Sequence, residues 1–172
     1  MKIGVIGGTG GMGKGFAIRW CMNHDILIGS RDAAKAVQAA SEYSKNAAEL
    51  YGSVKGEISG NDNLSVAKES DVLVLSIPYE NIDATCSQLL PNSKDDCVVI
   101  TPIVPITKTD AGFEFISFIE KKPSAFELVQ KYVKDKTKLV AAFHTVSEKK
   151  LADPNLILDF DIFVCGDDKN AV

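Results

Sequence analysis

Apolar residues along this chain fall into short continuous runs, and the segments between the runs carry apolar residues at helical spacing. The clearest runs, at residues 2–6, 25–29 and 71–77, are rich in β-branched side chains and are typical of buried strands. Further strands are predicted at residues 97–100, 139–143 and 161–165 and near Ile58, and helices after Met12, from Asp32, from Ile82 and after the Ser124/Glu127 capping box. This alternation predicts an α/β fold, namely a Rossmann-like, doubly wound, mainly parallel sheet with helices on both faces.

Prolines mark the ends of two predicted strands. Pro78 ends the third clear run, and Pro102 and Pro105 follow the next strand, as expected for a residue that cannot donate to a sheet ladder. In doubly wound sheets the ligand lies in a crevice at the carboxyl ends of the strands. Each proline is therefore open to two interpretations, as a simple strand terminator or as a ligand contact.

Composition narrows the class of protein. With 172 residues, 45% hydrophobic and 24% charged, the chain is expected to fold as one soluble domain over residues 1–172. The N-terminus leads directly into the first strand without a signal-peptide core, which predicts a cytoplasmic protein. A net charge of −4 without a basic block argues against nucleic acid, and no apolar run approaches the roughly 18 residues that cross a membrane. A small-molecule ligand is therefore expected, and the widely spaced cysteines are interpreted as free buried thiols: Cys21, Cys86, Cys97 and Cys165.

The glycine-rich stretch at residues 7–15, GGTGGMGKG, has two competing interpretations. A nucleoside triphosphate loop requires Ser or Thr after its lysine to bind magnesium, but Gly15 stands there. The alternative is the G-x-G-x-x-G turn of a dinucleotide-binding fold, with glycines Gly8, Gly10 and Gly13. Such glycines let the main chain approach a pyrophosphate, while the next helix offers free N–H groups. We favour this second interpretation, although such a turn also occurs without a ligand, and either Gly7 or Gly8 can be the first structural glycine.

The end of the second predicted strand bears on which dinucleotide is bound. An NAD site requires an acidic residue about 20 residues after the glycine turn, where it binds the ribose 2′-hydroxyl. Ser30 and Arg31 stand there instead, with Lys35 one helical turn further on. Arginine binds a phosphate through two parallel hydrogen bonds, whereas a carboxylate would repel it. The sequence therefore predicts NADP, although an ordinary helix start with solvated charges explains the same residues.

Several segments, taken in order, resemble the NADPH-dependent coenzyme F420 reductases, also called F420-dependent NADP oxidoreductases. These segments are residues 7–13, 29–31, 76–80, 101–105, 142–145 and 165–168, and the resemblance extends over the whole chain. It implies an oxidoreductase that passes hydride directly between NADP(H) and the deazaflavin coenzyme F420, so that the cofactors carry the chemistry. On this basis no residue is assigned a catalytic role and no metal is expected.

The resemblance also implies which residues bind the cofactors. The pyrophosphate would be held by the glycine turn, at Gly8, Thr9, Gly10, Gly11, Met12 and Gly13. The 2′-phosphate would be held by Ser30, Arg31 and Lys35. The stacked rings would be bordered by Pro78, Tyr79, Pro102, Val104 and His144. His144 is equally open to interpretation as a hydrogen-bonded structural residue, and Glu148 departs from the small residue that the family tends to have.

Members of this family continue past the position of Val172, into helices that complete a homodimer and part of the deazaflavin pocket. The chain is therefore interpreted as a member shortened at its C-terminus, which puts dimerisation and full activity in question. The sequence is also compatible with two other functions. One is an NADP-dependent reductase of an imine, keto acid or ferric complex, and the other is a non-catalytic NADP-binding module that senses redox state.

Overall fold

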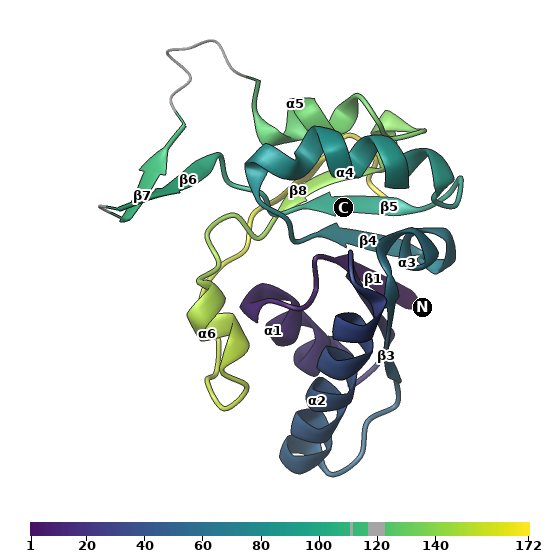
Figure 1. Cartoon of the computed structure of the whole chain (residues 1–172), viewed down its shortest axis with the longest axis vertical. Helices are drawn as coiled ribbons and strands as arrows, with labels where there is room; N and C mark the ends of the chain where they lie inside the picture. Colours follow the sequence, from purple (N-terminus) through teal and green to yellow (C-terminus); the bar gives the residue numbers. More distant parts are fainter. Residues whose placement is uncertain (111, 117–122) are drawn as a thin grey trace.

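The computed structural model describes residues 1–110, 112–116 and 123–172, and its centre is a seven-stranded sheet (Figure 1). The order across the sheet is β3-β2-β1-β4-β5-β8-β9, and every neighbouring pair is parallel except β8 and β9. The strands are β1 (Lys2–Ile6), β2 (Asp25–Ser30), β3 (Ile58–Asp62), β4 (Val72–Leu75), β5 (Val98–Thr101), β8 (Leu139–Ala142) and β9 (Val164–Gly166). A separate antiparallel hairpin consists of β6 (Ile106–Thr109) and β7 (Gly112–Phe115). The first six strands follow the Rossmann order, in which the direction of winding reverses between β1 and β4.

Helices cover both faces of the sheet, as a doubly wound fold requires (Figure 1). One face packs against α1 (Gly11–Trp20), α2 (Ala33–Tyr51) and α6 (Glu148–Ala152). The other packs against α3 (Asn63–Glu69), α4 (Ile82–Leu89) and α5 (Ala125–Gln130). Short 3₁₀ turns lie at η1 (Tyr79–Asn81), η2 (Leu90–Asn92) and η4 (Lys136–Lys138).

Each central strand sends alternate side chains into two separate cores. Val5 and Val74 join the core beneath α1 and α2, whereas Ile6, Leu73 and Leu75 join the core beneath α3 and α4. All five are completely buried. Burying a side chain of this size contributes roughly 1.5–3 kcal/mol, so the apolar runs of β1 and β4 are explained by helices on both of their faces.

The predicted fold class is confirmed, and every predicted strand is present with its ends moved by at most three residues. The predicted helix start at Asp32 is also confirmed, because its carboxylate accepts hydrogen bonds from the main-chain N–H groups of Ala34 and Lys35. The capping box of Ser124 and Glu127 opens α5 as expected. Short-range sequence signals therefore located these helix starts correctly.

Several elements differ from the predicted ones. The run at residues 71–77 is shorter as a strand, because the chain leaves the sheet after Leu75 to line the crevice. Helices α3 and α6 and the β6–β7 hairpin were not predicted at all. Strand β9 pairs antiparallel at the edge beyond β8, which agrees with the predicted mainly parallel sheet.

Two predictions about burial were wrong. Cys165 is exposed because it lies on the edge strand β9, whereas Cys21, Cys86 and Cys97 are free and buried as expected. Burial raises the pKa of the Cys86 thiol to about 12, which keeps it protonated. His24 directly precedes the second predicted strand, a position from which a surface side chain is expected, but it is half-buried. Its Nδ1 atom has no hydrogen-bond partner among the described residues. No helix in the described part of the chain is long and apolar enough to cross a membrane.

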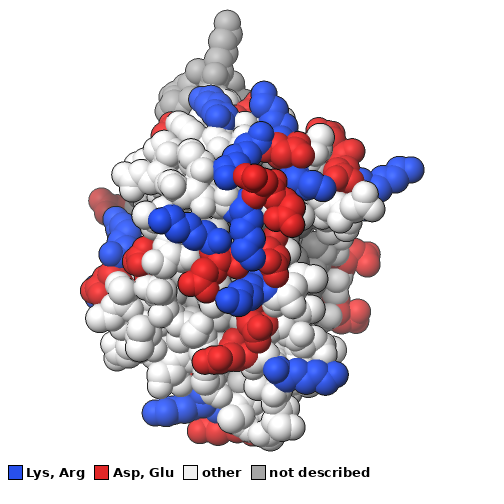
Figure 2. All heavy atoms as spheres, turned by 90° about the vertical axis from the view of Figure 1, so that its right-hand side faces the viewer, with Lys and Arg blue, Asp and Glu red and all other residues white. Residues whose placement is uncertain are grey.

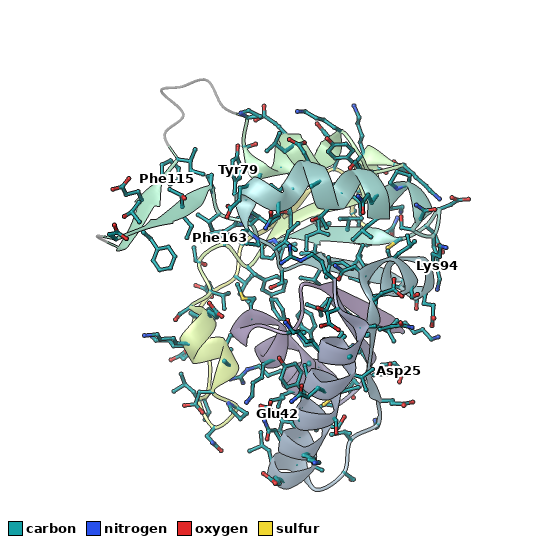
Figure 3. All side chains as sticks on the ribbon, in the orientation of Figure 1. Asp25, Glu42, Tyr79, Lys94, Phe115 and Phe163 are labelled. Carbon is teal, nitrogen blue, oxygen red and sulfur yellow. The ribbon has the colours of Figure 1, made fainter. Side chains whose placement is uncertain are left out.

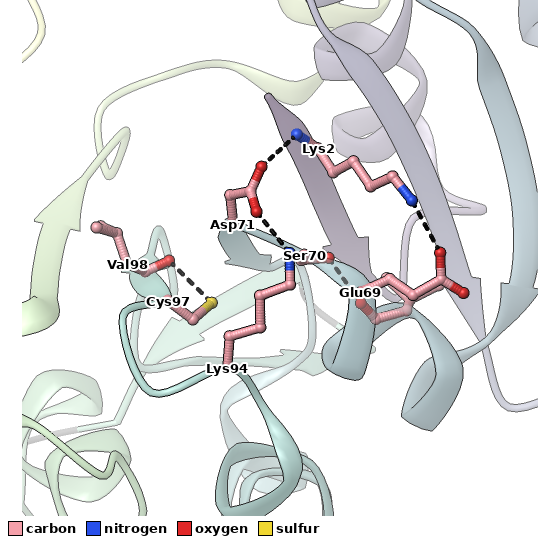
Figure 4. Close-up of polar contacts among 8 residues, drawn as sticks. Lys2, Glu69, Ser70, Asp71, Lys94, Cys97 and Val98 are labelled. Carbon is pink, nitrogen blue, oxygen red and sulfur yellow. Dashed lines mark hydrogen bonds and ion pairs between the residues drawn. The ribbon is translucent and has the colours of Figure 1, made fainter.

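Ion pairs hold the amino ends of the strands, opposite the crevice. Asp71 accepts a hydrogen bond from the main-chain N–H of Lys2 at 2.8 Å and pairs with Lys94 Nζ at 2.6 Å (Figure 4). Lys2 Nζ also pairs with Glu69 at 3.2 Å. Basic and acidic side chains alternate over this face of the molecule, with no broad field of one sign (Figure 2). Asp71 therefore links β1, β4 and the segment before β5 at one point.

We expect Asp71→Asn to lower the free energy of unfolding by about 1 kcal/mol, because it weakens an ion pair and a hydrogen bond that are both partly exposed. The Lys94 ammonium and the Lys2 amide lower the pKa of Asp71 in the folded protein. Its stabilisation is therefore present above the ordinary carboxyl pKa and is lost as the pH falls through the lowered one. Urea unfolding at pH 7 and at pH 3 to 4 measures both effects. Asp95→Asn, which changes a solvent-exposed pair with Lys134, is the control and is expected to change little; equal losses in the two variants would contradict the role of Asp71.

Candidate active site

The glycine turn between β1 and α1 is shaped by close main-chain packing. Gly7 has a positive φ of 69°, a conformation that glycine adopts without strain. A Cβ atom on Gly13 would lie 2.1 Å from the carbonyl oxygen of Gly8, so α1 can pack this closely on the turn only with glycine there. The N–H of Gly8 also donates to the carbonyl of Gly29 at 2.9 Å, which ties the turn to the end of β2. Both Gly7 and Gly8 are therefore structural, which answers the question that the sequence left open.

Gly10 differs from its neighbours in the turn because it faces open space. A Cβ atom on Gly10 would meet nothing within 4 Å, and its φ of −91° and ψ of 179° are accessible to any residue. Neither backbone conformation nor internal packing therefore requires glycine at this position. The Gly10 side of the turn is a surface that a pyrophosphate can approach closely, which fits the proposed dinucleotide.

Helix α1 begins at Gly11 with its first N–H groups directed toward this open space. Its N-cap is Gly10, which offers no side-chain hydrogen bond, and its first turn contains no acidic residue. Unpaired N–H groups and the helix dipole make such a terminus attractive to anions. One carboxylate already lies there, because Glu148 Oε1 accepts a hydrogen bond from the N–H of Gly11 at 3.1 Å.

Tyr43 of α2 supports the turn from beneath. Its hydroxyl lies 3.4 Å from the Gly8 carbonyl oxygen and 3.5 Å from that of Gly10, at the long limit of a hydrogen bond. Burial raises the pKa of Tyr43 to about 12, so the hydroxyl keeps its proton and acts as a donor. This contact could not be predicted from the sequence, since Tyr43 fits the ordinary apolar face of a helix.

A pocket of about 660 Å³ opens at the carboxyl ends of β1, β4, β5 and β8, which is the crevice expected at the reversal of winding. Seven predicted site residues line it together: Gly10, Met12, Pro78, Tyr79, Pro102, Val104 and His144. The β6–β7 hairpin contributes further lining that was not predicted, through Ile106 and Phe113. A volume of this size is typical of sites for cofactor-sized ligands.

Tyr79 and Phe115 mark the pocket end of the molecule, whereas Asp25 and Lys94 lie at the opposite end (Figure 3). The Tyr79 hydroxyl donates to the carbonyl oxygen of Pro123 at 2.6 Å. This bond fixes the ring, so Tyr79 contributes a wall to the pocket while its hydroxyl is already engaged.

His144 borders the pocket immediately after a strained residue. Phe143 is the one non-glycine residue in the described part of the chain with a positive φ, at 68°. Its ring packs edge-on against Phe16 with centroids 5.1 Å apart, and it also contacts Trp20. These contacts of α1 hold Phe143 and thereby direct His144 to the pocket. Partial burial lowers the pKa of His144, which favours its neutral form.

The carboxyl end of β2 presents exposed cations outside the pocket. Arg31 and Lys35 are both exposed, and neither takes part in an ion pair among the described residues. The nearby Asp32 carboxylate is engaged as the cap of α2. Ser30 Oγ accepts a hydrogen bond from the N–H of Asp32 at 3.2 Å, which leaves its own proton free to donate. In contrast, Lys14 of α1 is paired with Glu42 at 3.0 Å.

The fold and this site define a dinucleotide-binding domain of the Rossmann class, with an apolar pocket beside its glycine turn. Residues 2–105 match the family described as NADP oxidoreductase, coenzyme F420-dependent. The chain belongs to this family.

Relatives of known name agree with that assignment. The F420-dependent NADP reductase of Methanocaldococcus jannaschii is 37% identical over 99% of this chain and 75% of its own length. The enzyme of the same name from Methanothermobacter thermautotrophicus is 33% identical, over 100% of this chain and 73% of its own. A crystal structure of a putative F420-dependent NADP reductase from Arthrobacter superposes with a TM-score of 0.71 and 21% identity, covering 99% of this chain and 76% of the other. This last similarity concerns the fold.

We expect Gly13→Ala and Gly10→Ala to separate the stability of the turn from its ligand binding. The first variant places a methyl group against the main chain of Gly8 and is expected to lose about 1–3 kcal/mol of unfolding free energy. The second meets no protein atom, so its stability should stay within about 0.5 kcal/mol of the parent. Its methyl group would nevertheless occupy the approach to the turn, and NADPH affinity should fall by about tenfold or more. Urea unfolding and calorimetry measure the two quantities; unchanged NADPH affinity in Gly10→Ala would contradict this assignment of the turn.

Proposed function

We propose that this protein transfers hydride directly between NADP(H) and coenzyme F420, as its family membership indicates. The observation that supports this most strongly is one continuous site. The glycine turn and the amino terminus of α1, where Gly10 offers no capping side chain, adjoin a mainly apolar pocket at the carboxyl edge of the sheet. A site of this kind can hold a charged pyrophosphate at one end and planar rings at the other.

The phosphate groups of NADP(H) would be bound at two places. Thr9 to Met12 would bind the pyrophosphate through main-chain N–H groups, with Gly10 leaving room for close approach and Gly8 and Gly13 fixing the turn. Ser30, Arg31 and Lys35 would bind the 2′-phosphate, because two free cations and a hydroxyl donor lie together at the end of β2.

The rings would lie in the pocket between Pro78 and Tyr79 on one strand end, Pro102 and Val104 on the next, and His144. Hydride exchange is chemistry that the nicotinamide and the deazaflavin supply when both are bound. The chain then needs to hold the two rings in contact and to exclude water, for which rigid, largely apolar walls are suited. We assign no catalytic acid or base, and His144 acts as a neutral positioning residue.

We further propose that the protein acts in the cytoplasm, with residues 1–172 as its NADP-binding domain, and that it forms a homodimer when the C-terminal helices of the family are present. Large apolar side chains remain exposed near the hairpin and before β9, which supports contact with another protein surface there. Their exposed fractions reach 71% at Phe113, 88% at Ile157 and 77% at Phe163.

We expect Arg31→Glu to weaken NADPH binding by about 100-fold while changing NADH affinity by less than about threefold, since it removes a phosphate contact and adds repulsion. Calorimetric titration with each nucleotide measures the ratio. Lys45→Glu makes the same change in charge at another exposed position of α2 and should leave the ratio unchanged. Equal losses for NADPH and NADH in the Arg31 variant would remove the assignment of the 2′-phosphate site.

Stopped-flow mixing of NADPH with oxidised F420 tests the reaction itself. We expect the absorbance of oxidised F420 to decay, and deuterium carried at C4 of labelled NADPH to appear in the reduced coenzyme, because both rings share one dry pocket. NADH serves as the comparison and should react far more slowly. Binding of NADPH without any decay would favour a non-catalytic module, and deuterium found in the solvent would argue against direct transfer.

A further inference from the structure

The carboxylate of Glu148 lies where the proposed function requires an anion of the ligand. Its Oε1 atom accepts a hydrogen bond from the N–H of Gly11, the first residue of α1, at 3.1 Å. The two residues are 137 positions apart in the sequence. A Cβ atom on Gly11 would lie 2.6 Å from Oε1, so the carboxylate rests directly on the α carbon. Glu148 also lines the pocket together with Gly10 and Met12.

The backbone that carries Glu148 is held firmly along α1. A Cβ atom on Gly15 would lie 2.5 Å from Leu151, which is buried, so α1 and α6 are in close contact. The guanidinium of Arg19 donates to four carbonyl groups that follow Glu148, those of Lys150, Leu151, Asp153 and Leu156, at 3.5, 3.2, 2.6 and 3.1 Å. The packing of α6 on α1 therefore places Glu148 at the amino terminus of α1. Its side chain is exposed and has room to turn toward solvent.

A carboxylate at this position does for α1 what a bound phosphate would do. It accepts from an N–H group that no residue within α1 satisfies, and its negative charge lies at the positive end of the helix dipole. A pyrophosphate that binds the same N–H must displace the carboxylate or accept its repulsion. Both effects oppose binding, and neither concerns the 2′-phosphate at the end of β2.

We propose that Glu148 occupies the pyrophosphate site when no nucleotide is bound and thereby sets the affinity for NADP(H). This inference rests on the proposed function. Glu148 is thus a residue that tunes affinity by competition, and binding proceeds as its side chain leaves the N–H of Gly11. Removal of a residue that merely stabilised the fold would have the opposite effect on affinity, because it would loosen the site and weaken the binding of the nucleotide.

The test is calorimetric titration of NADPH into the parent protein and the variants Glu148→Ala and Glu148→Gln. We expect the alanine variant to bind NADPH about five- to tenfold more tightly, with the glutamine variant between it and the parent, since the amide still accepts from Gly11 but carries no charge. Adenosine 2′-monophosphate, which lacks the pyrophosphate, should bind all three proteins equally. Glu69→Gln makes the same change in charge at the opposite end of the sheet and should bind NADPH as the parent does.

The outcomes separate this inference from the proposed function. NADPH binding that is unchanged or weaker in both Glu148 variants overturns the role of Glu148 and leaves the proposed function standing, because the parent still binds. Tighter binding of adenosine 2′-monophosphate by the same factor also overturns it, since the effect would then not concern the pyrophosphate. Absence of NADPH binding in every protein overturns the proposed function itself. If the alanine variant fails to fold, the glutamine variant carries the test through the same comparison.

Discussion

The close packing of α1 on the turn that follows β1 is the constraint on which the rest of the site depends. It exists because Gly13 packs directly on the main chain of Gly8, where any side chain would collide. This contact brings the amino end of α1 to the carboxyl edge of the sheet, beside the ends of β4 and β5. An apolar pocket and a helix terminus are common separately, and the glycine contact is what makes them adjacent here.

Electrostatics divides the nucleotide site into two parts of different kind. At the turn, attraction for an anion comes from main-chain N–H groups and the dipole of α1, and a carboxylate of the chain itself already uses one of these groups. At the end of β2, attraction would come from the exposed charges of Arg31 and Lys35, which form no ion pair within the described part of the chain. In the proposed function, the first part would bind the pyrophosphate of any dinucleotide, and the second would distinguish the one with an additional phosphate. Affinity and selectivity can therefore change independently through substitutions in different elements.

The features of the fold and the site that could be predicted are those determined by residues close to one another in the sequence. The glycine turn, the cap of α2 at Asp32 and the capping box before α5 are set by residues within a few positions of one another, and all were located correctly. The pocket could also be anticipated, because the order of strands in a doubly wound sheet places known strand ends together.

Contacts that join distant segments could not be predicted in this way. Glu148 meets Gly11 across 137 positions, and the Tyr79 hydroxyl meets Pro123 across 44. The β6–β7 hairpin was missed because its alternating residues are mostly exposed and give little apolar contrast, although the glycine at the start of β7 marks a turn. Each of these features depends on how elements pack after they have formed, which a single sequence does not record.

Helix α1 contacts residues at both ends of the ligand site and thereby fixes their relative position. Its first residues face the proposed pyrophosphate position, Phe16 lies in its middle, and its last turn contains Arg19 and Trp20. Phe16 and Trp20 hold Phe143 in its strained conformation, and this positions His144 at the ring end of the pocket. Arg19 fixes the segment that carries Glu148. A displacement of α1 would therefore move the phosphate end, the ring end and the competing carboxylate together, so the site responds to the packing of one helix rather than to each residue separately.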